Sequence, residues 1–525
     1  MNLRTIKASA VAAALLAVAA VGCTDTTVQP KSAVGAGQTF ADPAAYEYLL
    51  AKVYATFALT GQQGPAGNND VSYEDEGFSQ YMRLYWEMEE LPTDEAVIGW
   101  GDVGLPALNT GVWTSTNGFT GGMYYRIFYA IAMANDFLRL TDGVNTPEMP
   151  TYRAEARFLR ALAYFHAIDL FGDVPLSTTI SATQPTQAKR ADIFAFLISE
   201  LNAIKGQLPP STAAYYGRAT TQAANMLLAE LYLNAGVYTG TPNWAGAQAA
   251  AQAVITSGAY SLDNTYAYNF GADNNLSPEI IFAITQDGQH TQSYGMTSFL
   301  IHAECFDTPA ETAVSLGYGS GNCWYGLRMK PEAVHFYDTT ADHPAGDSRI
   351  NVIVSAGQNL QVTCITGCNT DGYLSRKWNN NKSTGGTGSN SSFADTDFPV
   401  WRLAEAYLIN AEAALRGGSA ADSAQALTYV NLLRTRAYNG ASGNITAAQL
   451  TLPFILKERG RELLWEAHRR TDLIRFGHWS DAAFTWSWEN NVQAGAAYAA
   501  CLNLYPIPSN EIVANPNMKQ VSSCY

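Results

Sequence analysis

The sequence predicts a mainly α-helical protein in which pairs of helices form a scaffold, with one large loop-rich region and a few short strands. Apolar residues recur at helical spacing through residues 38–260 and again through 399–480. Between these stretches, residues 266–398 are rich in Gly, Asn, Ser and Thr and hold only short extended runs. Because 47% of the residues are hydrophobic and 15% are charged, the chain can bury a large core.

Residues 1–22 are predicted to be a lipoprotein signal peptide. Basic residues precede an apolar run, 10–21, that is too short to span a membrane. Small residues then lead to Cys23, whose thiol would carry the lipid. Ala20 stands where such cleavage boxes usually have Leu, and an ordinary signal peptide followed by a chance Cys is the alternative.

The mature chain is expected to start with a tether and continue as one domain. Residues 23–37 are polar, with Thr, Ser, Gln and Gly, and suit a flexible lipidated tether. Residues 38–525 then form a single domain: the helical scaffold, the loop-rich insertion and a C-terminal tail, 481–525. Prolines in this tail prevent one helix from running through it.

The scaffold helices are predicted from apolar stripes and from residues that end helices. Residues 155–171 carry two adjacent apolar stripes, and Gly172 and Pro175 follow them. A helix with two apolar stripes packs against neighbours on both sides, as in a stacked helical array. Further helices are predicted over residues 43–59, 123–140, 192–205, 221–235, 244–257, 399–415, 423–437 and 454–476.

Two of these segments, 221–235 and 244–257, read as a helical pair. Thr220 is the predicted N-cap of the first helix, and Gly236 ends it. Small and large apolar residues alternate along both helices, which resembles TPR units of about 34 residues. The scaffold is therefore predicted to be TPR-like.

The predicted loops differ from the scaffold in composition. Residues 73–102 are acidic and aromatic, and 92–95 signal a turn or the start of a helix. Residues 105–120 are predicted to be loop. The long insertion includes short extended runs at 279–284 and 350–354. A structureless stretch as long as this insertion is uncommon inside one domain unless it is functional.

Six cysteines besides Cys23 are predicted to form disulfides. An exported protein meets an oxidising compartment, and an even number of cysteines fits complete pairing. Fifteen pairings exist for six cysteines, and local pairs are the simplest. Cys364 and Cys368 lack a second nearby pair of metal ligands, so we expect no zinc site. The expected pairs are Cys305–Cys323, Cys364–Cys368 and Cys501–Cys524.

Several segments resemble the SusD/RagB-like family of outer-membrane nutrient-binding lipoproteins. The helix EARFLRALAYFHAIDLFGDVPL, residues 155–176, resembles the signature helix of that family. Matches follow in family order along the mature chain, and they include ELPTDEAV, GRAT…LLAELYLNAG, DFPVWRLAEAYLINAEAALRGG, ILKERGRELLWEAHRRTDLIRFGHW and LYPIPSNEIVANPNMKQ.

This resemblance implies that the protein binds a nutrient and does not catalyse a reaction. It implies a lipid-anchored outer-membrane protein, exposed at the cell surface, that captures a nutrient and passes it to a TonB-dependent β-barrel transporter. The ligand would be an oligosaccharide, with a peptide as the alternative. The net charge of −15, without a basic tract, argues against nucleic acid as a partner. A surface glycoside hydrolase and a purely structural adaptor are two further readings.

We identify no catalytic set in the sequence. Glu458, Glu462 and Glu466 lie four residues apart on one predicted helix face, so they would lie on the same side of any substrate. They are interpreted instead as part of a structural ion network with nearby arginines: Arg461, Arg469 and Arg470. His166 and His468 lie on predicted helices among apolar or ion-paired residues and are expected to be structural.

One loop, 335–349, concentrates histidines and aspartates. Such a group could bind a cation, and calcium is the candidate, but we expect no metal site. The family resemblance instead implies a structural pair, Asp347 with Arg349.

Aromatic residues in loops are the candidate ligand-binding residues. Sugar C–H faces stack on Trp and Tyr rings, while Asn, Asp and Arg hydrogen-bond the hydroxyls. The 29 Tyr and 11 Trp exceed what a core needs. The candidates are Tyr73, Tyr81, Trp86, Trp100, Tyr318, Asn322, Trp324, Tyr325 and Arg328, with Asp75 and Asp102 as further acceptors. Core packing is expected for Trp113, Trp378, Trp401 and Trp465.

Overall fold

The computed structural model describes residue 42 and residues 44–71, 75, 77–307, 312 and 315–525. The predicted signal peptide, Cys23, the tether and Tyr73 lie outside the described residues. Two compact units are distinguished, residues 1–51 and residues 52–525, and their boundary falls inside helix α3, Ala44–Ala58. The second unit contains the predicted insertion, the predicted tail and all the helices that follow α3.

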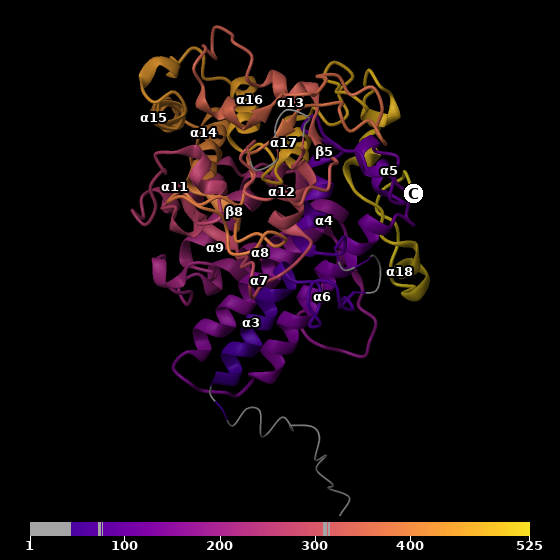
Figure 1. The fold of residues 1–525 in the computed structure, drawn as a ribbon. Helices are drawn as coiled ribbons and strands as arrows, with labels where there is room; N and C mark the ends of the chain where they lie inside the picture. The colour runs from indigo at the N-terminus through magenta and orange to yellow at the C-terminus, as the bar shows by residue number, and fades with distance from the viewer. Residues whose placement is uncertain (1–41, 43, 72–74, 76, 308–311, 313–314) are drawn as a thin grey trace, which may run out of the picture. The chain divides into compact units, whose positions relative to one another are not determined.

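The second unit is built on an array of α-helices in which neighbours along the chain pack side by side (Figure 1). Helix α11 packs between α9 and α14, and α14 also contacts α15 and α16. The helices of this array are α6 (Gly118–Leu140), α7 (Met149–Phe171), α8 (Arg190–Ile204), α9 (Thr221–Leu233), α11 (Trp244–Ile255), α14 (Leu403–Gly417), α15 (Ala420–Ala437) and α16 (Leu452–Glu462).

The helix ends follow the signals in the sequence. Helix α7 is buried on both predicted stripes, contacts α6 on one side and α8 on the other, and ends where Gly172 takes a φ of 75°. The Thr220 hydroxyl accepts a hydrogen bond from the backbone N–H of Ala223 and so caps α9 as predicted. Ser419 and Asp422 form a capping box at the start of α15.

Short antiparallel strand pairs link the array to the loops. Strand β4 (Ile280–Ile284) pairs with β8 (Phe398–Arg402), and β1 (Ala96–Ile98) pairs with β5 (Leu327–Met329). The predicted helix 399–415 is therefore wrong at its start, because residues 398–402 pair with β4 before α14 begins. The other pairs are β2 (Val174–Pro175) with β3 (Gln187–Ala188), and β6 (Ile353–Val354) with β7 (Leu374–Ser375).

The loop regions hold more helix than the sequence predicts. Helix α12 (Met296–Glu304) lies within the insertion and is buried along its whole length. Residues 105–120, predicted as loop, begin with a short helix, α5 (Leu105–Thr110). The run 350–354 is mostly a 3₁₀ turn, η4 (Ser348–Val352), and only its last two residues are strand. The other α-helices are α4 (Tyr81–Glu90), α10 (Ala235–Thr239), α13 (Pro331–His335), α17 (Arg469–Phe476) and α18 (Ser509–Ala514).

The predicted helix 454–476 is broken in two. Helix α16 ends at Glu462 and α17 begins at Arg469, and Trp465 and Ala467 between them take positive φ values of 59° and 64°. Carboxylates from α4 and its following turn satisfy the backbone in the break: Glu90 accepts from the N–H of Ala467 (2.7 Å), and Glu95 from that of Trp465 (3.1 Å). Buried side chains distant in sequence therefore override the local helical pattern.

Ala467 should tolerate glycine but not a β-branched residue. Its side chain is 2% exposed, and its positive φ is strained for bulky residues. We expect Ala467→Val to lower the free energy of unfolding by about 2–3 kcal/mol through strain and overpacking. Ala467→Gly should change it by less than about 1 kcal/mol, because relief of strain offsets the lost methyl group. Urea denaturation checks both, and equal effects of the two substitutions would contradict the role of backbone strain.

All three predicted disulfides are present in the structure. They join Cys305 to Cys323, Cys364 to Cys368, and Cys501 to Cys524.

Within the described residues, no helix combines the length and the apolar character needed to cross a bilayer.

Candidate ligand-binding site

Five half-buried aromatic rings from separate segments come together in what we call the aromatic platform: Phe78, Trp100, Tyr294, Trp324 and Phe393. The ring centroids of Trp100 and Trp324 lie 6.4 Å apart, and that of Tyr294 lies 6.2 Å from Trp324. Phe393 extends the row beyond Tyr294 at 5.1 Å, and Phe78 lies 6.4 Å from Trp100. The rings form a continuous, partly exposed apolar surface.

Trp100 is fixed in orientation by the chain that follows Trp324. Its indole N–H donates to the backbone oxygen of Tyr325 (2.9 Å). The ring packs against Gly326 so closely that a Cβ there would lie 2.2 Å from Trp100 Nε1. Glycine at this position is therefore required for the observed position of the indole.

Arg83 lies beneath one end of the aromatic platform. Its guanidinium carbon lies 4.1 Å from the ring centroid of Phe78 and 4.2 Å from that of Phe299. Arg83 Nε donates to the carboxylate of Glu87 (2.9 Å), whereas Arg83 Nη2 has no hydrogen-bond partner within the described part of the chain. A buried donor of this kind is stabilised by an additional acceptor.

His302 supports the other end of the aromatic platform. Its ring stacks under Trp324 with centroids 5.0 Å apart. One ring nitrogen, Nδ1, lies against the backbone oxygen of Asn322, and Nε2 lies 3.1 Å from that of Ser392. Burial lowers the pKa of His302. The histidine thus links α12 to two loops below the tryptophan.

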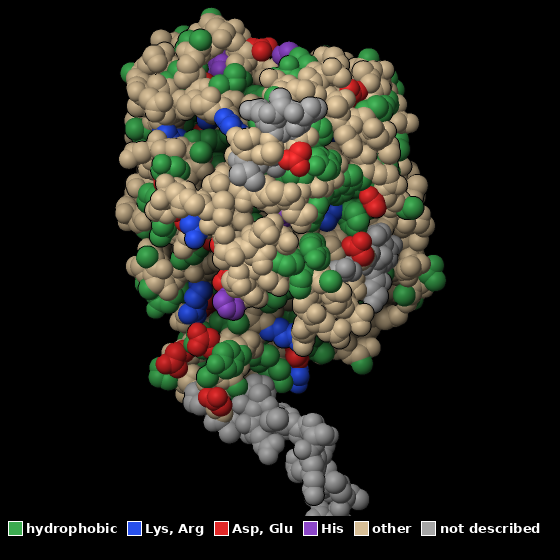
Figure 2. Space-filling model, in the orientation of Figure 1, with side chains coloured by type: hydrophobic (Ala, Val, Ile, Leu, Met, Phe, Trp, Pro, Cys, Tyr) green, Lys and Arg blue, Asp and Glu red, His purple; other side chains and the backbone are tan. Residues whose placement is uncertain are grey.

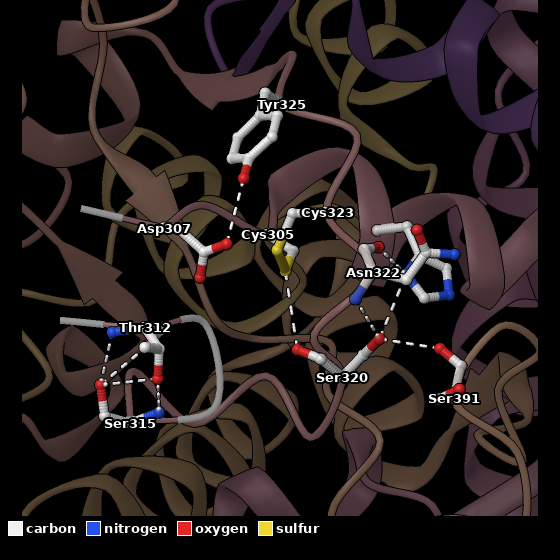
Figure 3. Close-up of a disulfide and its surroundings, with 10 residues drawn as sticks. Cys305, Asp307, Thr312, Ser315, Ser320, Asn322, Cys323, Tyr325 and Ser391 are labelled. Carbon is white, nitrogen blue, oxygen red and sulfur yellow. Dashed lines mark hydrogen bonds between the residues drawn. A yellow bond between two sulfur atoms is a disulfide. The ribbon is translucent and has the colours of Figure 1, made fainter. Parts of the chain in front are cut away.

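The Cys305–Cys323 disulfide lies beside these loops (Figure 3). On one side of it, the Tyr325 hydroxyl donates to Asp307 (3.1 Å). On the other side, Ser320 Oγ donates to the backbone oxygen of Ser391 (2.9 Å). The bridge directly precedes Trp324 and so anchors the segment that carries this ring.

Polar groups surround the aromatic platform. Asn322 is exposed beside Trp324. Asp75 and Asp102 line an open hollow next to Phe78, together with Val103. On the face drawn in Figure 2, hydrophobic side chains form small groups within a mainly uncharged polar surface. Rings with amide and carboxylate groups at their edge can hold a flat ligand that is rich in hydroxyl groups.

Four of the predicted ligand-binding residues are buried, so their prediction as surface ligands is corrected. Tyr81 and Trp86 lie on α4, which is buried on all sides; Tyr81 hydrogen-bonds His166, and Trp86 donates to the backbone oxygen of Trp465. Tyr318 lies in an apolar cluster with the Cys305–Cys323 bridge. Arg328 is 1% exposed and donates to backbone oxygens of residues 368 and 371, which fixes that loop.

The other predicted residues meet at the aromatic platform, apart from Tyr73, which lies outside the described residues. Trp100 and Trp324 form its centre, and Asn322 and Tyr325 flank Trp324. Their role in ligand binding stays a prediction. Sequence reasoning missed three of the five rings, which come from loops far apart in sequence. Tyr294 and Phe393 each follow serine residues, a weak signal of exposure. The missed residues are Phe78, Tyr294, Phe393, Arg83 and His302.

The predicted ion network is confirmed, but with different partners. Glu458, Glu462 and Glu466 are buried, and most of the basic residues that pair with them are distant in sequence. Burial alone would raise the pKa of Glu458, but Arg349, followed by Arg461 and Arg434, lowers it to about 2. Arg461 is thus a correctly predicted partner. Arg469 and Arg470 pair instead with other acids, Asp94 for Arg469 and both Glu89 and Asp169 for Arg470.

The loop of histidines and aspartates is a structural junction. Arg349 donates to Asp347 (2.7 Å) and to Glu462 (2.8 Å), and His343 Nε2 lies 3.0 Å from Asp347. The structural Asp347–Arg349 pair is thus confirmed.

The four tryptophans predicted to pack in the core are buried: Trp113, Trp378, Trp401 and Trp465.

Comparison with known proteins identifies the family that has this helical array. Residues 349–525 match the SusD family, and residues 86–233 match a family described as "Starch-binding associating with outer membrane". The chain is 34% identical to the starch-binding protein SusD of Bacteroides thetaiotaomicron over 90% of this chain and 91% of that protein. The chain belongs to the SusD family, whose members are binding proteins and not enzymes.

Solved structures share the fold. Surface glycan-binding protein A from Bacteroides thetaiotaomicron, in complex with laminarihexaose, superposes with a TM-score of 0.70 at 19% identity and covers 91% of this chain and 99% of that chain. Surface glycan-binding protein A from Bacteroides fluxus gives a TM-score of 0.70 at 20% identity, covering 92% of this chain and 100% of that chain. At these identities the likeness shows the fold alone.

Proposed function

We propose that this protein captures an oligosaccharide at the cell surface on the aromatic platform. The single observation that supports this most strongly is the row of four rings from Trp100 to Phe393, with centroid spacings of 6.4, 6.2 and 5.1 Å. Successive sugar units of a chain present apolar faces at intervals of a few ångströms, so several units can stack at once. The starch-binding relative supports a glucan as the first ligand to test.

The polar groups at the edge would orient the sugar chain. Asn322 beside Trp324, and Asp75 and Asp102 beside Phe78, can pair with hydroxyl groups. Affinity would come from apolar contact, and direction from these few polar groups.

We further propose that a lipid on Cys23 anchors the protein at the outer membrane and that it delivers its ligand to a TonB-dependent β-barrel transporter. The support is the lipoprotein-like sequence at Cys23 and the description of the matched family as associating with the outer membrane. Detergent extraction of membranes, followed by capture of this protein, should co-purify the barrel. Recovery of the protein from the soluble fraction, or capture without a barrel, would contradict this proposal.

Ligand class is tested by calorimetry with a panel of malto-oligosaccharides, laminari-oligosaccharides and peptides. We expect a glucan to bind and Trp324→Ala to weaken it by about fivefold or more, because a stacked aromatic ring contributes about 0.5–1.5 kcal/mol beyond the area that it buries. Trp244→Ala, which removes a half-buried tryptophan on α11, is the matched control and should leave affinity unchanged. Binding of peptides alone would overturn the ligand class, and release of shorter glycans would indicate a hydrolase.

Gly326→Ala should disturb the aromatic platform without removing a ring. The added Cβ would meet Trp100 Nε1 at 2.2 Å and force the indole from its hydrogen bond to the Tyr325 oxygen. We expect about tenfold weaker glycan binding and a shifted tryptophan emission spectrum. Gly321→Ala is the control in the same loop, because a Cβ there meets no atom within 4 Å. Unchanged binding in Gly326→Ala would mean that Trp100 does not touch the ligand.

A further inference from the structure

A second pocket shares no lining residue with the aromatic platform. It has a volume of about 410 Å³ and lies between the end of α15, the turn η4 and the turn η2 (Tyr266–Phe270). Five asparagines and two arginines line it, and none of the lining residues within the described part of the chain is acidic. The composition of the pocket lining contrasts with the formal net charge of the chain, which is −15. The volume lies in the usual range for small-molecule sites.

Arg376 gives this pocket a fixed cationic group. Its Nε donates to the backbone oxygen of Asn351 (2.9 Å), and its Nη1 donates to that of Leu316 (3.2 Å). Within the described residues, Arg376 forms no salt bridge and its Nη2 makes no hydrogen bond. The guanidinium is therefore oriented by neutral acceptors and keeps its charge and one edge for an anion.

Exposed amides line the same pocket as this guanidinium. Asn264, Asn351 and Asn439 line the pocket, and their side chains make no hydrogen bond within the described part of the chain. Each amide can both donate to and accept from a hydroxyl group. The second arginine, Arg436, is neutralised by buried carboxylates, Glu279 and Glu462, and forms part of the wall.

We propose that this pocket is a second ligand site for a sugar unit that carries a carboxylate, such as a uronic acid in an acidic oligosaccharide. Arg376 would bind the carboxylate, and the exposed asparagines would bind the hydroxyl groups. A carboxylate on a protein of this net charge is repelled from most of the surface, so a pocket whose described lining residues include no acid is where such a unit can bind. This proposal is independent of the ligand of the aromatic platform.

The test is calorimetry on the purified protein with trigalacturonic acid, maltotriose and acetate. We expect trigalacturonic acid to bind more tightly than acetate, with an affinity that falls as NaCl is raised. Arg376→Gln should weaken this binding about tenfold, because hydrogen bonds to charged groups are among the stronger ones. Arg139→Gln removes the same charge from an exposed pair with Asp136 on α6 and should change affinity less than twofold. Trp324→Ala should leave trigalacturonic acid binding intact.

A second variant separates charge from loop structure, because Arg376 also holds two backbone oxygens. Asn264→Asp adds a negative charge at the pocket without removing any of these hydrogen bonds, and it should also weaken trigalacturonic acid about tenfold. Failure of the wild-type protein to bind trigalacturonic acid would overturn the proposal. Equal affinity for acetate would overturn the sugar class, and normal binding by Asn264→Asp would overturn the location of the site.

Discussion

Replacing Arg402 with Met is expected to lower the free energy of unfolding by at least about 3 kcal/mol. Arg402 is 1% exposed and contacts three buried carboxylates: Glu279 (2.7 Å), Glu462 (2.6 Å) and Glu466 (2.7 Å). Removing one partner from a buried ion pair costs about 3–5 kcal/mol, because the remaining charge stays buried without its counter-ion. The stability of the whole domain is only of the order of 5–15 kcal/mol.

Urea denaturation of purified variants measures this effect. Arg139→Met removes an exposed arginine paired with Asp136 and should cost less than about 1 kcal/mol. Glu462→Gln in the Arg402→Met background should recover part of the loss, because one uncompensated charge is removed. A cost for Arg402→Met no larger than that of the exposed control would mean that the other basic residues around Glu462 are sufficient.

Elements whose signals are local in the sequence could be predicted, whereas elements that depend on distant residues could not. Helix α7 was predictable because its stripes and its terminal Gly172 are local signals. The break between α16 and α17 was not, because it depends on Glu90 and Glu95, more than 300 positions away along the chain. Strand β8 overlaps a predicted helix, because its partner β4 lies more than 100 residues earlier in the chain. Non-local partners account for each of these differences.

The candidate site divides in the same way. Trp100 and Trp324 were predicted from aromatic loops, and the structure places their rings 6.4 Å apart. Trp86 came from the same acidic segment as Trp100 but is buried, because α4 is buried on all sides and two of its glutamates, Glu87 and Glu89, pair with arginines inside the protein. Glu89, for example, pairs with Arg470 at 3.1 Å. The acidic, aromatic composition of residues 73–102 predicts an exposed loop, where the structure has the buried helix α4.

We expect Glu458 and Glu95 to make opposite contributions to the pH dependence of the free energy of unfolding. Glu458 has a folded pKa of about 2, against about 4.3 when unfolded. A lowered pKa stabilises the fold above the unfolded value, so this contribution, about 3 kcal/mol, is lost as the pH falls from about 4.3 towards 2. Burial raises the pKa of Glu95 to about 8. Its contribution is complete below about 4.3 and is lost as the pH rises towards 8.

Urea denaturation at pH values from 2 to 8 measures the free energy of unfolding in the acid range, where Glu458 acts, and above about pH 4.3, where Glu95 acts. Glu458→Gln should be less stable at pH 6 but should lose less stability on acidification, because its site no longer takes up a proton. Glu95→Gln should flatten the decline between about pH 4.3 and 8 while keeping an acceptor for the backbone N–H of Trp465. The two variants change opposite ends of this pH range because arginines dominate around Glu458, whereas burial dominates at Glu95. An unchanged pH profile in Glu95→Gln would show that Glu95 is ionised in the folded protein.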